Sequence, residues 1–319
     1  MKSPPWSFVG LSTEQGQARP GLIDSPFIAL KFLDERFKFN QKINIEDRKV
    51  KTRIPDDGTL GFINWSFYHD AHRAIRDLLL RGNRVVNWGG DHSVGMATVS
   101  AFSNIYTDGY ILWIDAHADL NTAESSLTGN FHGMPLSILL GVGNIPSDEV
   151  RPYWSILDPK KLIYFGLRDV DPFEREVIDS LGITSYFSSE INFSSLDFIL
   201  SEILEQIGTN PLHISFDIDS IDPEFAPSTG VPARDGLSDL LINTLAKHLG
   251  RLTQLKSVDV VEINPRLGSF IEVIKTYSIA YHFLDQILES NKEGYYDSIH
   301  CTTKNKLLVS PSWNTPFWP

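Results

Sequence analysis

Short apolar runs alternate with longer amphipathic stretches along most of the chain. The short runs are apolar on both faces, which is typical of strands in a sheet that helices cover on both sides. Seven runs predict strands: Ser7–Leu11, Arg84–Trp88, Tyr110–Asp115, Lys161–Gly166, Ile183–Phe187, Leu212–Asp217 and Ser257–Ile263. Helical periodicity covers Phe67–Arg81, Val94–Ser103, Gly133–Leu140, Phe173–Leu181, Leu196–Ile207, Ser238–Leu249 and Glu272–Glu289. This alternation predicts an α/β fold with a mainly parallel central sheet.

Two stretches do not follow this pattern. Phe39–Gly58 is charged and interrupted by proline and glycine, so we expect a surface excursion there. The tail of residues 291–319 ends in several aromatic residues, which could pack on the body of the protein or on a neighbouring subunit. Because no linker or repeat interrupts the remainder, the sequence predicts a single domain over residues 1–319 and leaves the role of this C-terminal tail open.

Composition narrows the class of protein. The chain has 319 residues, of which 42% are hydrophobic, and a net charge of −12. That charge provides no basic surplus to neutralise phosphates, so we expect no nucleic-acid partner, whereas a cationic substrate would suit it. A single cysteine, Cys301, excludes an intrachain disulfide and a zinc–thiolate site and fits a cytoplasmic location. We expect neither a signal peptide nor a membrane span, because no long apolar stretch is present.

Charged and imidazole side chains accompany the ends of four predicted strands. Ligands of parallel α/β sheets bind beyond the carboxyl ends of the strands, so these positions are candidates for function. After the strand that contains Ile114, extended backbone would project Asp115, His117 and Asp119 to the same side. The other candidates are His92 after Gly89-Gly90-Asp91, Asp217 and Asp219 at the end of Leu212–Asp217, and Glu262 within Ser257–Ile263.

The candidate set has the composition of a metal site. Each residue alone has an ordinary structural interpretation as a cap, a turn residue or a paired carboxylate. Taken together, that interpretation would require four separate strand ends to carry such groups by accident. Four aspartates in one pocket would raise one another's pKa values strongly, whereas two divalent cations would cancel their charge. Oxygen-rich ligands with two imidazoles and no thiolate favour manganese(II) over structural zinc. Two such ions roughly 3.5–4 Å apart would hold a water molecule and lower its pKa.

Six sequence blocks together resemble the ureohydrolase family, and among its members the arginases most. The blocks are Gly-Gly-Asp-His-Ser at 89–93, Asp-Ala-His-Ala-Asp-Leu-Asn at 115–121, Gly-Asn-Phe-His-Gly at 129–133, Gly-Leu-Arg-Asp-Val-Asp-Pro at 166–172, Ser-Phe-Asp-Ile-Asp-Ser-Ile-Asp-Pro at 215–223 and Val-Glu-Ile-Asn-Pro at 261–265. The resemblance extends from about Gly10 to the 280s. It implies a three-layer α/β/α sandwich and a homo-oligomer, commonly a trimer or hexamer.

The resemblance also implies a ligand set for two manganese ions, with cobalt as an alternative metal. The first ion would be bound by His92, Asp115, Asp119 and Asp217. The second would be bound by Asp115, His117, Asp217 and Asp219. Asp115 and Asp217 would therefore bridge the two ions.

The resemblance to arginases implies the conversion of L-arginine and water to L-ornithine and urea. By resemblance, Asp119 stabilises the tetrahedral intermediate and passes a proton to the departing amine. His132 would exchange protons with bulk water, since its ordinary pKa lies near the working pH. Glu262 would pair with the substrate guanidinium.

Further positions align with residues that distinguish arginine from other guanidino substrates. Asn121, Ser126, Thr128 and Asn130 align with donors to the α-carboxylate, Asp171 aligns with the acceptor of the α-amine, and Glu174 would assist through water. Two departures affect this inference. Val231 replaces a frequent threonine near the guanidinium, and Arg234-Asp235 replaces a frequent Gly-Gly pair.

Several alternatives remain open at this point. Agmatinase, guanidinobutyrase and formiminoglutamase share the metal site, and the sequence does not separate them with certainty from arginase. An inactive relative that binds a partner is the non-enzymatic alternative. A deacetylase of related fold would use one zinc ion, whereas this chain carries the residues for two ions.

Overall fold

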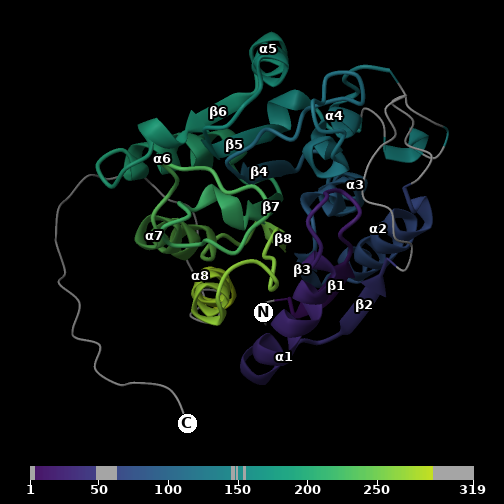
Figure 1. Cartoon of the computed structure of the whole chain (residues 1–319), viewed down its shortest axis with the longest axis vertical. Helices are drawn as coiled ribbons and strands as arrows, with labels where there is room; N and C mark the ends of the chain where they lie inside the picture. Colours follow the sequence, from purple (N-terminus) through teal and green to yellow (C-terminus); the bar gives the residue numbers. More distant parts are fainter. Residues whose placement is uncertain (1–3, 48–62, 145–147, 149, 154–155, 290–319) are drawn as a thin grey trace.

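The computed structural model describes residues 4–47, 63–144, 148, 150–153 and 156–289. Its strands form one eight-stranded sheet in the order β2-β1-β3-β8-β7-β4-β5-β6, and every neighbouring pair is parallel (Figure 1). The strands are β1 Trp6–Ser12, β2 Lys42–Glu46, β3 Arg84–Gly89, β4 Tyr110–Ile114, β5 Leu162–Leu167, β6 Thr184–Phe187, β7 Leu212–Asp217 and β8 Leu255–Val261. The predicted parallel sheet is therefore confirmed.

Side chains alternate between the two faces of the sheet and build a hydrophobic core on each. Val86 of β3 and Leu112 of β4 belong to one core, while Val85 and Ile111 beside them belong to the other. The first core includes residues of α1 Ser25–Phe37, α6 Leu196–Ile207, α7 Asp239–Leu249 and α8 Phe270–Glu289. The second includes residues of α2 Trp65–Leu80, α3 Gly95–Ser103, α4 Pro135–Leu140 and α5 Pro172–Leu181. Helices thus cover both faces, which confirms the three-layer α/β/α sandwich (Figure 1).

The first quarter of the chain contains the main errors of the sequence-based prediction. Strand β2 lies within the stretch that was expected to be a surface excursion, and helix α1 was not predicted. In β2, Ile43 and Ile45 are half-buried while the polar residues between and around them are exposed. A short edge strand with this composition has only two apolar residues to reveal it. Residues 48–58 of the expected excursion lie outside the described residues.

Two site-bearing segments also end differently from the prediction. Strand β4 ends at Ile114 and β8 at Val261, so Asp115 and Glu262 lie just beyond the strands. Asp119 and Glu262 have φ values of 52° and 64°, in the left-handed region. The expectation of extended backbone through Asp119 is therefore wrong, although the carboxylates of Asp115 and Asp119 still converge on the same nitrogen of His92.

The single domain over residues 1–319 remains a prediction, and the tail of residues 291–319 lies outside the described residues, as does Cys301. In the part of the chain that the structure describes, none of the helices has the length and apolar character needed to cross a membrane.

Candidate metal centre

Sheet topology brings the candidate residues to one place. Strands β3, β8, β7 and β4 are consecutive in the sheet, although they are far apart in sequence. Because all four are parallel, the segments that follow them meet at the same edge. These segments contain His92, Glu262, the Asp217–Asp219 turn and the loop that begins at Asp115.

A tight turn after β3 orients His92. A Cβ atom on Gly90 would lie only 1.7 Å from the carbonyl oxygen of Thr13, so the turn has no room for a side chain. Asp91 then caps the following helical turn by accepting the Ser93 amide at 3.1 Å, and it also accepts the Gly16 amide at 2.8 Å. The result is a rigid turn that directs the imidazole of His92 toward β4 and β7.

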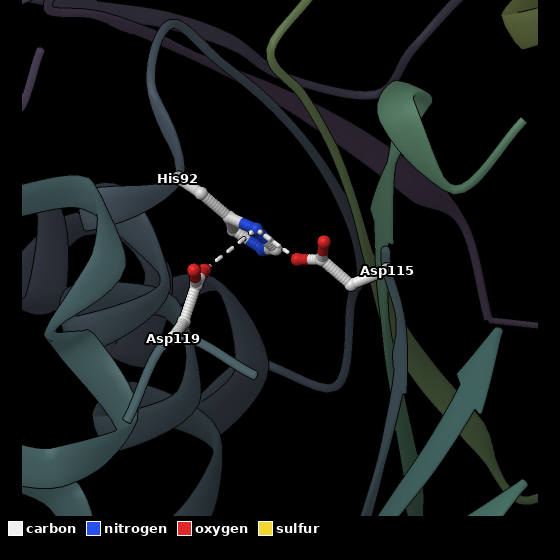
Figure 2. Close-up of side chains that lie close together, drawn as sticks. All are labelled: His92, Asp115 and Asp119. Atoms are coloured by element: carbon white, nitrogen blue, oxygen red, sulfur yellow. Dashed lines mark ion pairs between the residues drawn. The ribbon is translucent and has the colours of Figure 1, made fainter. Parts of the chain in front are cut away.

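Three carboxylates gather around one nitrogen of His92. The Nδ1 atom lies 2.9 Å from Asp115 Oδ2, 3.1 Å from Asp217 Oδ2 and 3.2 Å from Asp119 Oδ2. Figure 2 shows the imidazole between Asp115 and Asp119. All four side chains are buried, yet neither His92 Nδ1 nor Asp119 Oδ2 makes a hydrogen bond with the described residues.

These distances and unpaired atoms fit a cation. Neighbouring ligands of an octahedral ion, each about 2.1 Å from the metal, lie about 3 Å apart. Buried polar atoms without partners are costly unless a ligand satisfies them. We call His92, Asp115, Asp119 and Asp217 the deep cluster.

A second group lies beside it. The Nδ1 atom of His117 is 3.2 Å from Asp219 Oδ2 and 3.5 Å from Asp115 Oδ1. Asp115 thus presents one carboxylate oxygen to each imidazole, which suits a bridging ligand. Asp217 faces His92 through Oδ2, while its Oδ1 accepts the Asp219 amide at 2.8 Å. We call His117, Asp219 and the shared Asp115 the shallow cluster, because the His117 side chain is 21% exposed.

The pKa shifts of residues in the deep cluster indicate a site that favours bound positive charge. Burial and the neighbouring carboxylates raise the pKa of Asp217 well above its usual value, and burial together with Asp115 raises the pKa of Asp119 to about 6. Burial alone lowers the pKa of His92, but the surrounding carboxylates outweigh it and raise that pKa well above its usual value. The residues alone therefore hold protons that divalent cations would displace.

A buried polar network supports His92 from behind. Its ring stacks on Trp113 with centroids 4.0 Å apart, and its Nε2 lies 2.8 Å from Ser215 Oγ. Ser215 donates to Asp259 at 3.3 Å, and Asp259 also interacts with His213 Nε2 at 3.2 Å. Such partners fix the orientation of a ligating histidine. The sequence-based prediction missed this network, although polar residues inside buried strands were a signal for it.

The predicted proton shuttle and the predicted guanidinium partner lie against each other. Glu262 Oε1 accepts the His92 amide at 2.8 Å and lies 2.9 Å from His132 Nδ1. Its Oε2 accepts Gln17 Nε2 at 3.0 Å. Burial lowers the pKa of His132, but Glu262 outweighs this effect and raises it to about 9. Gln17 was not predicted from the sequence, because the contact joins residues 245 positions apart.

The residues predicted to recognise the substrate α-groups are only partly brought together. Asn121 Nδ2 donates to Asp171 Oδ2 at 2.8 Å, so these two residues are adjacent. Ser126 Oγ and Thr128 Oγ1 lie 3.5 Å apart, and the amide of Asn130 donates to Thr128 Oγ1 at 3.2 Å. These last three residues thus form a local turn, and no hydrogen bond joins their side chains to Asp171 within the described structure.

Glu174 joins two backbone segments through hydrogen bonds. Its two oxygens accept the amides of Leu120 and Asp171, both at 3.0 Å, and its side chain is buried. Burial raises its pKa to about 7. Glu174 therefore connects the loop after Asp119 to the start of α5, and the predicted assistance through water remains a prediction.

Val231 and Asp235, which depart from the residues frequent in the family, lie in different structural environments. Val231 is half-buried and follows Gly230, where a Cβ atom would lie 2.7 Å from Gln17 Oε1. Asp235 adopts a left-handed φ of 61°, and its carbonyl accepts Ser188 Oγ at 2.8 Å. This backbone conformation is typical of a turn residue.

Arg168, which was not among the predicted site residues, links the turn that contains Asp219 to the loop that contains Arg234. Its guanidinium donates to the carbonyls of Asp219 at 2.5 Å, Ser220 at 3.0 Å, Ala233 at 2.9 Å and Arg234 at 3.0 Å. One side chain thereby satisfies carbonyls from two segments.

A family model described as the arginase family matches residues 6–287. The chain belongs to the arginase family. Arginase from Glaciozyma antarctica (strain PI12) is 35% identical over 205 residues, which span 62% of this chain and 59% of that protein. Arginase from Schizosaccharomyces pombe is 31% identical over 286 residues, which span 86% of this chain and 88% of that protein.

Solved structures agree with this membership. The crystal structure of arginase from Bacillus subtilis subsp. subtilis str. 168 superposes with a TM-score of 0.80 and 27% identity, covering 89% of this chain and 98% of that one. The resemblance drawn from the sequence is therefore confirmed. Members of this family hold a binuclear metal site and act on small guanidino substrates, and the two clusters described above provide residues for such a site.

Proposed function

We propose that this protein is an arginase that hydrolyses L-arginine to L-ornithine and urea and uses two manganese ions. The observation that carries the proposal is the pair of clusters that share Asp115, since each imidazole faces one of its oxygens. Family membership supports the same conclusion. The ligand assignment follows the clusters, with Asp217 as the second proposed bridge.

When bound, the two ions would lower the pKa of a water molecule held between them and so supply the nucleophile. Cobalt could occupy the same donors, which are mainly carboxylate oxygens with two imidazole nitrogens. The donor set contains no thiolate, and manganese remains the better match to it.

The protein's own residues would bind the substrate and move its protons. Glu262 holds the cationic guanidinium beside the clusters through a charge-assisted hydrogen bond. Asp119 stabilises the tetrahedral intermediate and passes a proton to the departing amine. His132, whose side chain is 15% exposed, exchanges protons with solvent.

The other end of the substrate would meet neutral donors and a carboxylate. Asp171 accepts the α-amine, and Asn121, Ser126, Thr128 and Asn130 donate to the α-carboxylate directly or through water. Glu174 acts here by holding Asp171 and the Asp119 loop in place. A site with these polar groups discriminates against a substrate that lacks the α-amine and α-carboxylate, because the polar groups of the protein would then be left unpaired.

The decisive experiment measures urea release from a panel of guanidino compounds after loading with manganese or cobalt. We expect L-arginine to be turned over much faster than agmatine, 4-guanidinobutyrate or N-formiminoglutamate, the last followed by formamide release. Faster turnover of agmatine would contradict the proposal. An inactive, partner-binding relative would release no urea and bind less than one ion per chain.

We further propose a cytoplasmic homo-oligomer, a trimer or a hexamer. The single cysteine supports a reducing location, and family membership supports the assembly. Light scattering coupled to size-exclusion chromatography would measure the mass in solution, for which a monomer of 35.9 kDa would contradict the assembly.

A further inference from the structure

Glu262 is held in one orientation by three donors. Its backbone lies in the left-handed region, with a φ of 64°, and its side chain is 2% exposed. Among the described residues, Oε1 interacts with the His92 amide and with His132, whereas Oε2 accepts only Gln17. A carboxylate oxygen has two acceptor positions, so Oε2 retains one for a further donor.

Gln17 is itself fixed by its surroundings. It lies in the loop between β1 and α1, and its side chain is 2% exposed. The preceding Gly16 donates to Asp91 at 2.8 Å and accepts the His132 amide at 3.0 Å. On its other side Gln17 lies against Gly230, where an added Cβ atom would come within 2.7 Å of Gln17 Oε1. The amide is therefore held from both sides while it donates to Glu262.

We propose that Gln17 is a positioning residue that directs the free acceptor position of Glu262 Oε2 toward the substrate guanidinium. The inference rests on the proposed function. By occupying one acceptor position of Oε2, Gln17 determines where the other one points.

Replacing Gln17 by leucine tests this role, because leucine has a similar volume and no hydrogen-bond donor. The Gln17→Leu variant should raise the KM for L-arginine about tenfold, the effect of losing one hydrogen bond to a charged group. Its kcat should remain within about threefold of the wild type, and its manganese content should be unchanged. An unchanged KM, or a parallel loss of manganese, would overturn the proposal.

A matched control comes from the same loop. Gln15 accepts the Asn64 amide at 3.2 Å, so Gln15→Leu perturbs the loop without removing the Glu262 contact. This control should leave the KM within about twofold of the wild type. A tenfold rise in both variants would attribute the effect to the loop and reject the positioning role.

A double-mutant cycle isolates the coupling. In a Glu262→Gln background, Gln17→Leu should change substrate binding by less than about twofold, because the carboxylate that it orients is gone. A tenfold effect that persists in this background would show that Gln17 acts through another route. Should the leucine variant fail to fold, Gln17→Asn removes the reach of the amide with less disturbance and carries the same expected rise in KM.

Binding of guanidinium chloride to the manganese-loaded protein, measured by calorimetry, gives the same comparison without turnover. Gln17→Leu should weaken guanidinium binding about tenfold relative to both the wild type and Gln15→Leu, and equal binding by all three would overturn the positioning role. If the wild type binds guanidinium but hydrolyses no guanidino compound, the proposed function fails while the calorimetric comparison still tests Gln17.

Discussion

The deep and the shallow cluster differ in what lies behind the histidine of each. Behind His92, a serine leads to Asp259, and this whole arrangement is buried. Behind His117, Nε2 faces the Asp169 carboxylate at 3.7 Å, beyond hydrogen-bond distance, and that side chain is 71% exposed. Both histidines thus have a carboxylate on the outer side, but only one of these carboxylates is shielded from solvent.

This difference has an energetic consequence. Charges in a buried environment interact more strongly than charges that water screens, so Asp259 should act on His92 more strongly than Asp169 acts on His117. His117 also has a more exposed side chain than His92. We therefore expect the deep cluster to bind its ion tightly and the shallow cluster to exchange its ion more readily.

Removing the deep imidazole should have the largest effect. The His92→Ala variant should lose more than about a hundredfold in manganese affinity at the deep cluster, exceeding the loss typical of an outer partner. Urea release should not recover in millimolar manganese, because the deep ion is required to organise Asp115 and Asp119. Activity that returns fully with added manganese would remove the distinction between the clusters.

Removing the shallow imidazole should be reversible by metal. The His117→Ala variant should bind one manganese ion about as tightly as the wild type and the other much more weakly. Its urea release should be very low at equimolar metal and should rise as manganese is added in excess. A variant that loses both ions together would show that the clusters are not separable.

The buried carboxylate behind His92 offers a direct comparison with the exposed one behind His117. Asp259→Asn should weaken deep-site manganese binding about 10- to 100-fold, in the range for outer partners of metal ligands. Asp169→Asn is the matched variant and should weaken shallow-site binding by less than about tenfold. Calorimetric titration of both variants measures the two effects, and equal losses would contradict the role assigned to burial.

The substrate-binding side of the site should respond to substrate identity rather than to metal. Asp171→Ala should raise the KM for L-arginine about tenfold or more, because the α-amine loses a charged partner, and should change the KM for agmatine by less than about twofold. Steady-state kinetics with both substrates checks this, with manganese content as the control. Equal effects on the two substrates would reject the α-amine contact.

The smallest effect should come from a residue that belongs to neither cluster. Asp235 holds a left-handed φ of 61°, which costs a residue with a side chain of order 1 kcal/mol and glycine much less. Asp235→Gly should therefore raise the melting temperature by about 1–3 °C without changing manganese affinity. A lower melting temperature would show that the Asp235 side chain stabilises the fold through contacts of its own.

The sequence predicted the elements with strong apolar patterns and the chemistry at their ends. Strand β4 is an uninterrupted apolar run and β7 alternates apolar with polar residues, and Asp115 and Asp217 follow or close these two strands. Strand β2 was missed, since exposed polar residues flank its two isoleucines.

Long-range contacts explain what could not be predicted at the site. The support of Glu262 by Gln17 and of His92 by Asp259 depends on which loops the fold brings together, which periodicity alone does not reveal. The left-handed backbone of Asp119 and Glu262 was not predicted either, because most aspartates and nearly all glutamates have a negative φ.

The most direct test of this account is a calorimetric titration of the metal-free protein with manganese, with urea release from L-arginine followed at each addition. We predict two ions per chain, the first bound more tightly than the second, and full activity only after the second has bound. A single ion per chain, two ions of equal affinity, or no urea release at saturation would contradict the account.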